Sequence, residues 1–292
     1  MIEVSGLTKR FGRTTALDGL DLSVREGEVH GFLGPNGAGK STTIRILLGL
    51  MRASGGSARI LGRDPWSEPV ATHRDIAYVP GDVSLWPGLT GGEAIDLLTS
   101  LRGGADAALR ESLIEEFELD PRKKGRSYSK GNRQKVALIA AFSRRARLYI
   151  LDEPCSGLDP VMDAVFRRQV ERVRGEGATV LLSSHILGEV EQLCERVTII
   201  REGAVVETGS LAELRHLSGT TFRLPGDVGR GLVAHLAGVH EVRTVGDAIE
   251  FDADPSAVPA VLDALARHRV STLTVAPASL ESLFMRHRSG RA

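Results

Sequence analysis

The 292-residue sequence has few cysteines, few aromatic residues and no excess of either charge. Its two cysteines, Cys155 and Cys194, lack the spacing of metal ligands and are too few for a disulfide framework, which fits a reducing compartment. Lysine plus arginine total 37 and aspartate plus glutamate total 37, so no basic field is available to gather nucleic acid. The composition therefore argues against disulfide-rich, zinc-binding and DNA-binding proteins.

Long hydrophobic runs are missing as well. Residues 1–12 include Glu3, Lys9 and Arg10, so we expect no signal peptide. The longest apolar stretches, such as 44–51, fall far below the roughly 20 residues that cross a bilayer. With 42% hydrophobic and 25% charged residues, the composition is that of a folded globular protein. Any role at a membrane would need a separate chain.

Short β-branched runs alternate with helical patterns from residue 1 to about 217, which predicts an α/β domain with a central sheet. The clearest predicted strands are 29–33, 76–79, 148–151, 179–183 and 197–201. Helical patterns such as 92–101 and 105–117 dominate the segment from about 85 to 146. They predict a helical insertion in the α/β domain.

After residue 209 the pattern changes to strand, helix, strand, strand, helix, strand. The predicted elements are 222–224, 228–236, 242–245, 248–252, 258–268 and 270–275. Gly246 and Asp247 supply the turn of the middle hairpin. This order predicts a small α+β domain of the split-βαβ type over 220–292, with a boundary at 217–220 and a last helix that begins near Pro277.

A glycine-rich motif, GPNGAGKS, follows the strand 29–33 and opens a helical run over 42–50. Backbone amides of such a loop turn inward around phosphate oxygens, and the helix N-terminus adds its positive end. Lys40 would neutralise phosphate charge, and Ser41 would ligate Mg²⁺. The alternative is a flexible turn. The predicted nucleotide-binding residues here are Gly34, Pro35, Asn36, Gly37, Ala38, Gly39, Lys40, Ser41 and Thr42.

Two carboxylates, Asp152 and Glu153, end the apolar strand 148–151. The carboxyl ends of strands are where α/β sheets bind ligands. Asp152 would hold Mg²⁺, directly or through water, and Glu153 would polarise the water that attacks the γ-phosphate. Taken alone, the pair is also compatible with a solvated turn. His185 follows the strand 179–183 and could hold the same water, although a single histidine is more often structural.

A serine, Ser129, precedes the helical run 133–142. Its hydroxyl and the amides of the first helical turn could bind a phosphate from outside the chain. An ordinary serine N-cap explains the same pattern. The residues leave both interpretations open.

Taken together, these segments resemble the ATP-binding subunits of ABC transporters over residues 1–217. Gly34 to Ser41 is similar to the Walker A motif, 148–153 to Walker B with its catalytic glutamate, and His185 to the switch histidine. The resemblance implies a P-loop NTPase core with a helical subdomain at about 85–146 and an antiparallel β subdomain. It also implies ATP and Mg²⁺ as cofactors.

The segment YSKGN stands where that family has its LSGGQ signature. The resemblance implies that this segment contacts the ATP bound by a second copy of the chain, through Ser129, Lys130, Gly131 and Asn132. Ser129 and Gly131, which supply phosphate contacts in the family, are retained. Lys130 replaces a glycine and either adds charge at that contact or points to solvent. The SGLD motif, which lies shortly after Glu153, resembles the D-loop; its residues are Ser156, Gly157, Leu158 and Asp159.

Two further positions follow from the resemblance. Phe11 stands where the family stacks an aromatic ring on adenine, the alternative being a core phenylalanine. Gly81 stands where the family has the Q-loop glutamine, so one Mg²⁺ contact is missing. The neighbouring Asp82 is a candidate to replace it.

The C-terminal residues ASLESLFM, 278–285, resemble the accessory domain of daunorubicin-resistance-type export ATPases. That resemblance implies ABC-2-type membrane subunits on a separate chain, a second copy of this chain in an ATP-bound dimer, no nucleic-acid partner, and a cytoplasmic location at the inner membrane face. Export of a drug, antibiotic or lipid-like compound is the expected function. The alternatives are a non-transport ABC ATPase and an ATP-sensing regulatory module.

Overall fold

The computed structural model describes residues 1–218, 220–225, 230–233, 235–268, 270 and 272–277. Contacts between residues divide the chain into two compact units, 1–208 and 209–292. The sequence boundary at 217–220 lies one helix later than this division, because α8 (Leu211–Ser218) groups with the second unit. In the described part of the chain, no helix is both long and apolar enough to cross a membrane.

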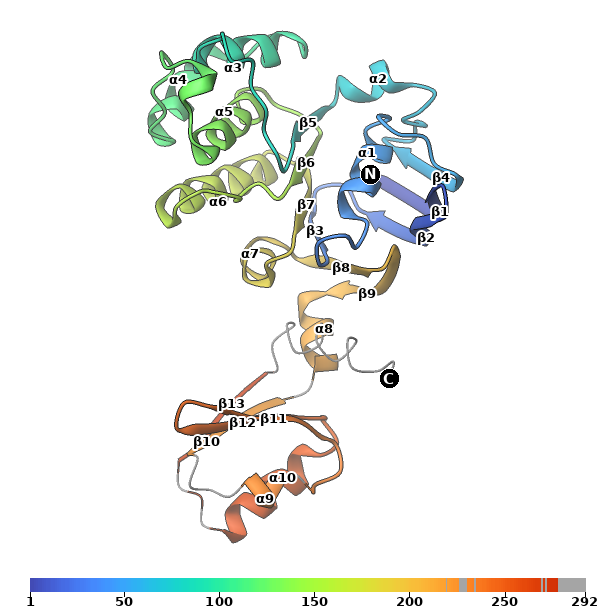
Figure 1. Cartoon of the computed structure of the whole chain (residues 1–292), viewed down its shortest axis with the longest axis vertical. Helices are drawn as coiled ribbons and strands as arrows, with labels where there is room; N and C mark the ends of the chain where they lie inside the picture. Colours follow the sequence, from blue (N-terminus) through green and yellow to red (C-terminus); the bar gives the residue numbers. More distant parts are fainter. Residues whose placement is uncertain (219, 226–229, 234, 269, 271, 278–292) are drawn as a thin grey trace. The chain divides into compact units, whose positions relative to one another are not determined.

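A six-stranded sheet forms the centre of the first unit (Figure 1). In sheet order its strands are β5 (Ile76–Val79), β6 (Leu148–Asp152), β7 (Thr179–Ser184), β3 (Val29–Leu33), β8 (Arg196–Arg201) and β9 (Ala204–Ser210). The pairs from β5 through β8 are parallel. β3, β6 and β7 are buried at every position, as their unbroken apolar runs predict for parallel strands. These strands confirm the α/β core expected from the sequence.

A second, antiparallel sheet packs on the same core. Its strands are, in order, β2 (Thr14–Val24), β1 (Ile2–Phe11) and β4 (Gly55–Ile60). Helix α1 (Lys40–Leu47) contributes Ile44 and Leu47 to a buried cluster that also holds Ile2 of β1 and Ile150 of β6. The helix that leaves the glycine-rich loop is therefore held by both sheets.

Helices make up most of the segment between β5 and β6. Figure 1 shows α3, α4 and α5 gathered together there. Besides α1, the helices of the first unit are α2 (Pro69–His73), α3 (Gly91–Ser100), α4 (Ala107–Glu116), α5 (Lys130–Phe142), α6 (Pro160–Gly175) and α7 (Leu187–Leu193), with a 3₁₀ turn, η1, at Gly125–Ser127. Thr90 and Glu93 form a capping box on α3, and Asp106 caps α4. The residues of α5 from Gln134 to Phe142 are all buried, so this helix is the core of the insertion.

The second unit has the element order predicted from the sequence. After α8 come β10 (Thr220–Pro225), α9 (Arg230–Val233), β11 (Val239–Val245), β12 (Ala248–Ala253), α10 (Val258–Arg267) and β13 (Thr274–Pro277). The four strands described in this unit form an antiparallel sheet in the order β11, β12, β10, β13. Phe222 and Phe251 stack in its core with ring centroids 5.2 Å apart.

Two predictions for this unit need comment. The last strand begins at Thr274 rather than at Val270, because the Val270 N–H still donates to the Leu265 carbonyl (3.1 Å) at the end of α10. The helix expected near Pro277 and the 278–285 segment lie outside the described residues.

Candidate active site

Four loops of the first unit meet at one edge of the parallel sheet. The register pairs Val79 of β5 with Leu151, Asp152 of β6 with Ser183, and Leu33 of β3 with Ser184 of β7. Because these strands run in the same direction, the segments that follow them leave the sheet at the same edge. The glycine-rich loop, Glu153, His185 and Gly81 are brought together in this way.

The glycine-rich loop can be built only with glycine at its turning points. Gly39 has φ 110°, and a Cβ there would lie 2.7 Å from Leu17 Cδ2. A Cβ on Gly34 would lie 2.6 Å from the Ile200 carbonyl oxygen. α1 begins at Lys40, earlier than the predicted residue 42, because Gly39 already serves as its N-cap. The amides of the first helical turn therefore belong to the loop and have no partner within the helix.

Lys40 is 4% exposed and points back into this loop. Its ammonium donates to the Gly34 carbonyl (2.6 Å) and to the Pro35 carbonyl (3.3 Å). It also lies 3.5 Å from Glu153 Oε1. A buried ammonium held by two carbonyls and one carboxylate is placed to receive the negative charge of a phosphate chain.

The strand-end carboxylates are positioned by β7. Asp152 is 5% exposed, so it is not a solvated turn, and it accepts a hydrogen bond from the Ser183 hydroxyl. The Glu153 N–H donates to the Ser183 carbonyl (3.1 Å) and hydroxyl (3.2 Å). Glu153 has φ 47°, a left-handed conformation that is uncommon for a residue with a long side chain. The tertiary structure thus holds a strained backbone at this glutamate.

Glu153 is the centre of a small polar cluster. Its Oε1 lies 3.5 Å from Lys40 Nζ and 3.3 Å from His185 Nδ1. The Glu153 side chain is 26% exposed and that of His185 is 43% exposed, so water can reach both. A carboxylate between a cation and an imidazole, open to solvent, can orient a water molecule and accept its proton.

The loop that carries His185 is fixed by residues that sequence reasoning missed. The Ser184 hydroxyl donates to Glu189 Oε2 (2.6 Å), and the Ile186 N–H donates to the Ser184 hydroxyl (2.9 Å). Burial raises the pKa of Glu189, which also faces Asp163. The only sequence signal was the Ser-Ser-His run at the end of β7, which does not reveal that Glu189 returns to it.

Ser129 is the N-cap of α5, and its hydroxyl accepts from the Asn132 N–H (3.2 Å). Lys130 does not point freely to solvent, because its ammonium donates to the Ser156 hydroxyl (2.6 Å). A Cβ on Gly131 would lie 2.4 Å from the Gly157 carbonyl oxygen. The signature-like and D-loop-like segments are therefore in direct contact within one chain.

The D-loop-like segment leads from Glu153 into α6. The Leu158 N–H donates to the Cys155 carbonyl (3.0 Å). Asp159 caps α6, and its Oδ1 accepts from the Val161 and Met162 N–H groups at 3.0 Å each. A groove of about 560 Å³ runs along this segment. Its lining includes Glu153, Ser156, Asp159, Asp163, His185 and Glu189.

The two remaining predicted positions also lie on the first unit. Phe11 is 48% exposed and therefore is not a core residue, and Lys9 Nζ lies 5.1 Å from its ring centroid. A Cβ on Gly81 would lie 3.2 Å from the Asp152 carbonyl oxygen, which places this glycine beside the Walker B-like strand. Asp82 is exposed.

The oxygen atoms of this site suit Mg²⁺. Asp152 supplies a buried carboxylate, and Ser41 supplies a hydroxyl in the first turn of α1. Hard oxygen donors are the ligands that Mg²⁺ prefers, and it usually takes others from phosphates and water. Among the described residues, no group of three or more His, Cys, Asp or Glu side chains is arranged to hold a metal by itself.

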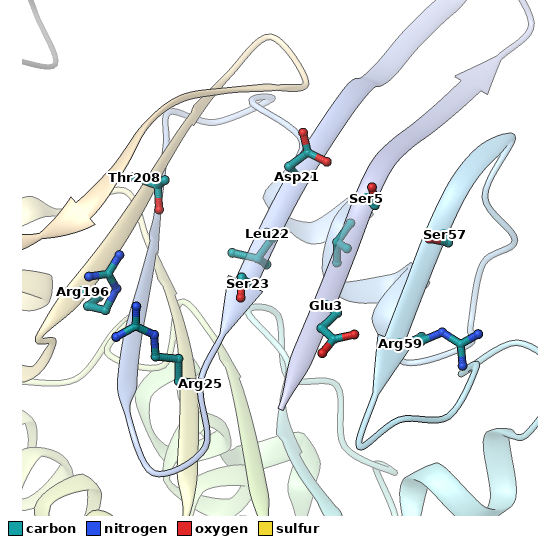
Figure 2. Close-up of a pocket in the computed structure, with 11 residues that line it drawn as sticks. Glu3, Ser5, Asp21, Leu22, Ser23, Arg25, Ser57, Arg59, Arg196 and Thr208 are labelled. Atoms are coloured by element: carbon teal, nitrogen blue, oxygen red, sulfur yellow. The ribbon is translucent and has the colours of Figure 1, made fainter.

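Two other hollows of the first unit lack these features. Figure 2 shows one, of about 400 Å³, over the antiparallel sheet, where Arg25 and Arg196 lie on one side and Glu3 and Arg59 on the other. A larger one, of about 670 Å³, has a mainly apolar lining that includes Trp86 and Leu101. Neither lies at the carboxyl edge of the parallel sheet with a glycine-rich loop, so neither is the nucleotide site.

A glycine-rich loop between β3 and α1, with a buried lysine and strand-end carboxylates, defines a P-loop nucleotide-binding protein. Comparison with known proteins narrows this class. Residues 17–156 match the family model described as ABC transporter. The daunorubicin/doxorubicin resistance ATP-binding protein DrrA of Streptomyces peucetius is 39% identical over 270 residues, which cover 90% of this chain and 81% of that protein.

Solved structures give the same result. The structure of an ATP-binding subunit of an ABC transporter matches with a TM-score of 0.68 and 33% identity, over 74% of this chain and 92% of that one. The dimeric structure of MJ0796, a bacterial ABC transporter cassette, matches with a TM-score of 0.65 and 25% identity, over 72% and 99%. This chain belongs to the ATP-binding proteins of the ABC transporter family, and it is an ATPase.

Proposed function

We propose that this chain is the motor subunit of an exporter whose membrane-spanning part is a separate, ABC-2-type chain. The observation that carries the motor part of the proposal is the convergence of Lys40, Glu153 and His185 at the edge of the parallel sheet. A protein that only senses ATP needs the lysine but neither a positioned carboxylate nor an imidazole beside it. The arrangement is that of a site that turns ATP over.

Each side chain has a role that its position supports. The amides of the glycine-rich loop and Lys40 bind the phosphates, while Phe11 presents a half-exposed ring on which adenine stacks. Ser41 and Asp152 would hold Mg²⁺, which would offset phosphate charge when it is bound. Glu153 accepts the proton of the attacking water, and His185 keeps that water in line with the γ-phosphate.

Each ATP is also contacted by a second copy of this chain. Ser129 and Gly131 lie at the N-terminus of α5, which is exposed at Ser129, and a helix N-terminus favours an anion. The related cassette MJ0796 has been solved as a dimer. Two copies that each offer a glycine-rich loop and an α5 N-terminus would enclose two nucleotides. ATP then joins the copies, and hydrolysis releases them.

The apolar hollow of about 670 Å³ is the docking site for the membrane chain. Leu50, Val70 and Leu101 around it are 64%, 71% and 77% exposed. Exposed apolar side chains gathered around one concave surface mark a site for a partner. A coupling helix of the membrane chain would lie there, and we infer that this protein acts in the cytoplasm at the inner face of the membrane.

The cargo is a drug, an antibiotic or a lipid-like compound. This extension rests on the relative DrrA, which is a drug-resistance protein and matches over both units of this chain. Reconstitution with the membrane chain into vesicles tests it. ATP added on the side of this subunit should move the compound to the opposite side. Accumulation on the side of the ATPase would indicate an importer and overturn the export proposal.

Asp82 is proposed to supply part of the Mg²⁺ contact that is missing at Gly81. A Cβ on Gly81 would lie 3.7 Å from Asp152 Cγ, so Asp82 follows directly on a residue that lies beside the proposed metal-binding carboxylate. Asp82→Ala should raise the Mg²⁺ concentration needed for half-maximal ATP hydrolysis. The matched control is Asp64→Ala, in the loop after β4. An unchanged Mg²⁺ dependence would assign the contact elsewhere.

A further inference from the structure

Lys130 is the residue at which this chain departs most in chemistry from the family signature. It occupies the first turn of α5, and that turn contains no acidic residue. A helix N-terminus already carries partial positive charge, so a lysine there is electrostatically unfavourable. The stability of α5 therefore does not account for this residue, whereas the structure shows a contact outside the helix.

That contact is with the D-loop-like segment of the same chain. Lys130 Nζ donates to the Ser156 hydroxyl at 2.6 Å. The Cγ and Cδ atoms of Lys130 each lie 3.5 Å from the position that a Cβ on Gly157 would take. The lysine thus hydrogen-bonds to Ser156 through its ammonium, while its stem runs past Gly157.

The backbones of the two segments already touch at this point. A Cβ on Gly131 would lie 2.4 Å from the Gly157 carbonyl oxygen, and Gly157 has φ 83°. Only glycines allow so close an approach. Lys130 adds a directional hydrogen bond to a contact that is otherwise made by backbone atoms, and it thereby fixes the position of the turn relative to α5.

A short turn connects this contact to Glu153. The Ser156 N–H donates to the Glu153 carbonyl (3.1 Å). Glu153 itself has φ 47°, and its carboxylate faces Lys40 and His185. A left-handed glutamate persists only when its surroundings hold it. Displacement of Ser156 would let Glu153 relax and would move its carboxylate.

We propose that Lys130 is a positioning residue that acts through Ser156 to hold the turn carrying Glu153. The proposal rests on the proposed hydrolytic role of Glu153. In this proposal, Lys130 affects the position of Glu153 in its own chain. A lysine that touched the nucleotide of a second copy would instead act on binding of that nucleotide.

The test is a double-mutant cycle with Lys130→Met, which keeps the stem and removes the donor, and Ser156→Ala. Each single variant should lower kcat about fivefold, as expected for the loss of one hydrogen bond. The KM for ATP should stay within about twofold, because no nucleotide contact is lost. The double variant should be no slower than either single one. Lys123→Met, an exposed lysine of the same subdomain, is the control and should match the wild type.

A second measurement separates this role from a phosphate contact. Two variants are compared, Glu153→Gln alone and Glu153→Gln combined with Lys130→Met. Both should reach half-maximal dimerisation at the same ATP concentration. A rise of about tenfold would show that the lysine binds nucleotide and would overturn the proposal. Single effects that multiply to about 25-fold in the double variant, or no effect on kcat, would also overturn it. A wild-type chain without ATPase activity would instead refute the proposed function.

Discussion

Replacement of Glu153 by glutamine tests the proposed chemistry most directly. The change keeps the shape of the side chain but removes its charge and its capacity to accept a proton. The loss of a positioned general base lowers turnover by about 10²–10⁴-fold. Because the hydrogen bonds from the Glu153 N–H to Ser183 do not involve the side chain, the fold should be retained.

The structure also predicts the effect of this change on ATP binding. At 3.5 Å, the gross attraction between Glu153 and Lys40 is about 5 kcal/mol at an effective dielectric constant of 20. Solvent screening of a partly exposed pair reduces the net value to about 1 kcal/mol. Lys40 freed of this carboxylate should bind the phosphates more strongly, so ATP affinity should rise about fivefold.

Phosphate release measures turnover, and light scattering after size exclusion measures molar mass with and without Mg-ATP. The variant should hydrolyse slowly and double its mass only with ATP. Glu118→Gln is a matched control, because Glu118 is exposed and also has a left-handed backbone, with φ 50°. A fall in turnover of less than about tenfold would refute the role of Glu153 as the base. Weaker ATP binding would refute the argument from Lys40.

Three further predictions concern the surroundings of this site. Phe11→Ala should weaken ATP binding by about 1–3 kcal/mol, whereas Phe11→Tyr should not, as measured by nucleotide titration. Gly131→Ala should cost about 1–3 kcal/mol in unfolding free energy and impair ATP-driven dimerisation, because its Cβ would meet the Gly157 carbonyl oxygen at 2.4 Å. Gly175→Ala, where a Cβ meets open space, should do neither. Burial raises the folded-state pKa of Glu189, so the folded protein loses stability when this carboxyl ionises above about pH 4. Glu189→Gln avoids that loss. In thermal melts, the variant should therefore become more stable relative to the wild type as the pH rises.

The elements around the nucleotide could be predicted because their signals are local. A strand followed by GPNGAGKS and a helix has few backbone solutions, and the unbroken apolar run 148–151 predicts a strand buried on both faces. The order of strands and helices likewise predicted both units. Element ends were less certain: α1 and α5 begin earlier than their apolar patterns, since glycine and serine caps set the start.

Contacts between distant positions could not be predicted in this way. From the sequence, Lys130 could face solvent, a phosphate or another side chain. Its hydrogen bond to Ser156 follows only from the packing of α5 against the turn after Glu153. The sequence also allowed Phe11 to be a core residue. In the structure it lies at the end of a hairpin, where its ring is half exposed. The role of Glu189 could not be read from the Ser-Ser-His run, because it depends on the return of α7 to Ser184.

The sequence by itself determined the P-loop, the strand-end carboxylates and the α/β order, because each is encoded within a few consecutive residues whose backbone geometry admits little choice. The tertiary structure alone decided which side chains meet at the sheet edge. Lys40, Glu153 and His185 come from three different strand ends, and their distances of 3.3 to 3.5 Å depend on the parallel register of β3, β6 and β7. That register is a property of the packed sheet and not of any one segment.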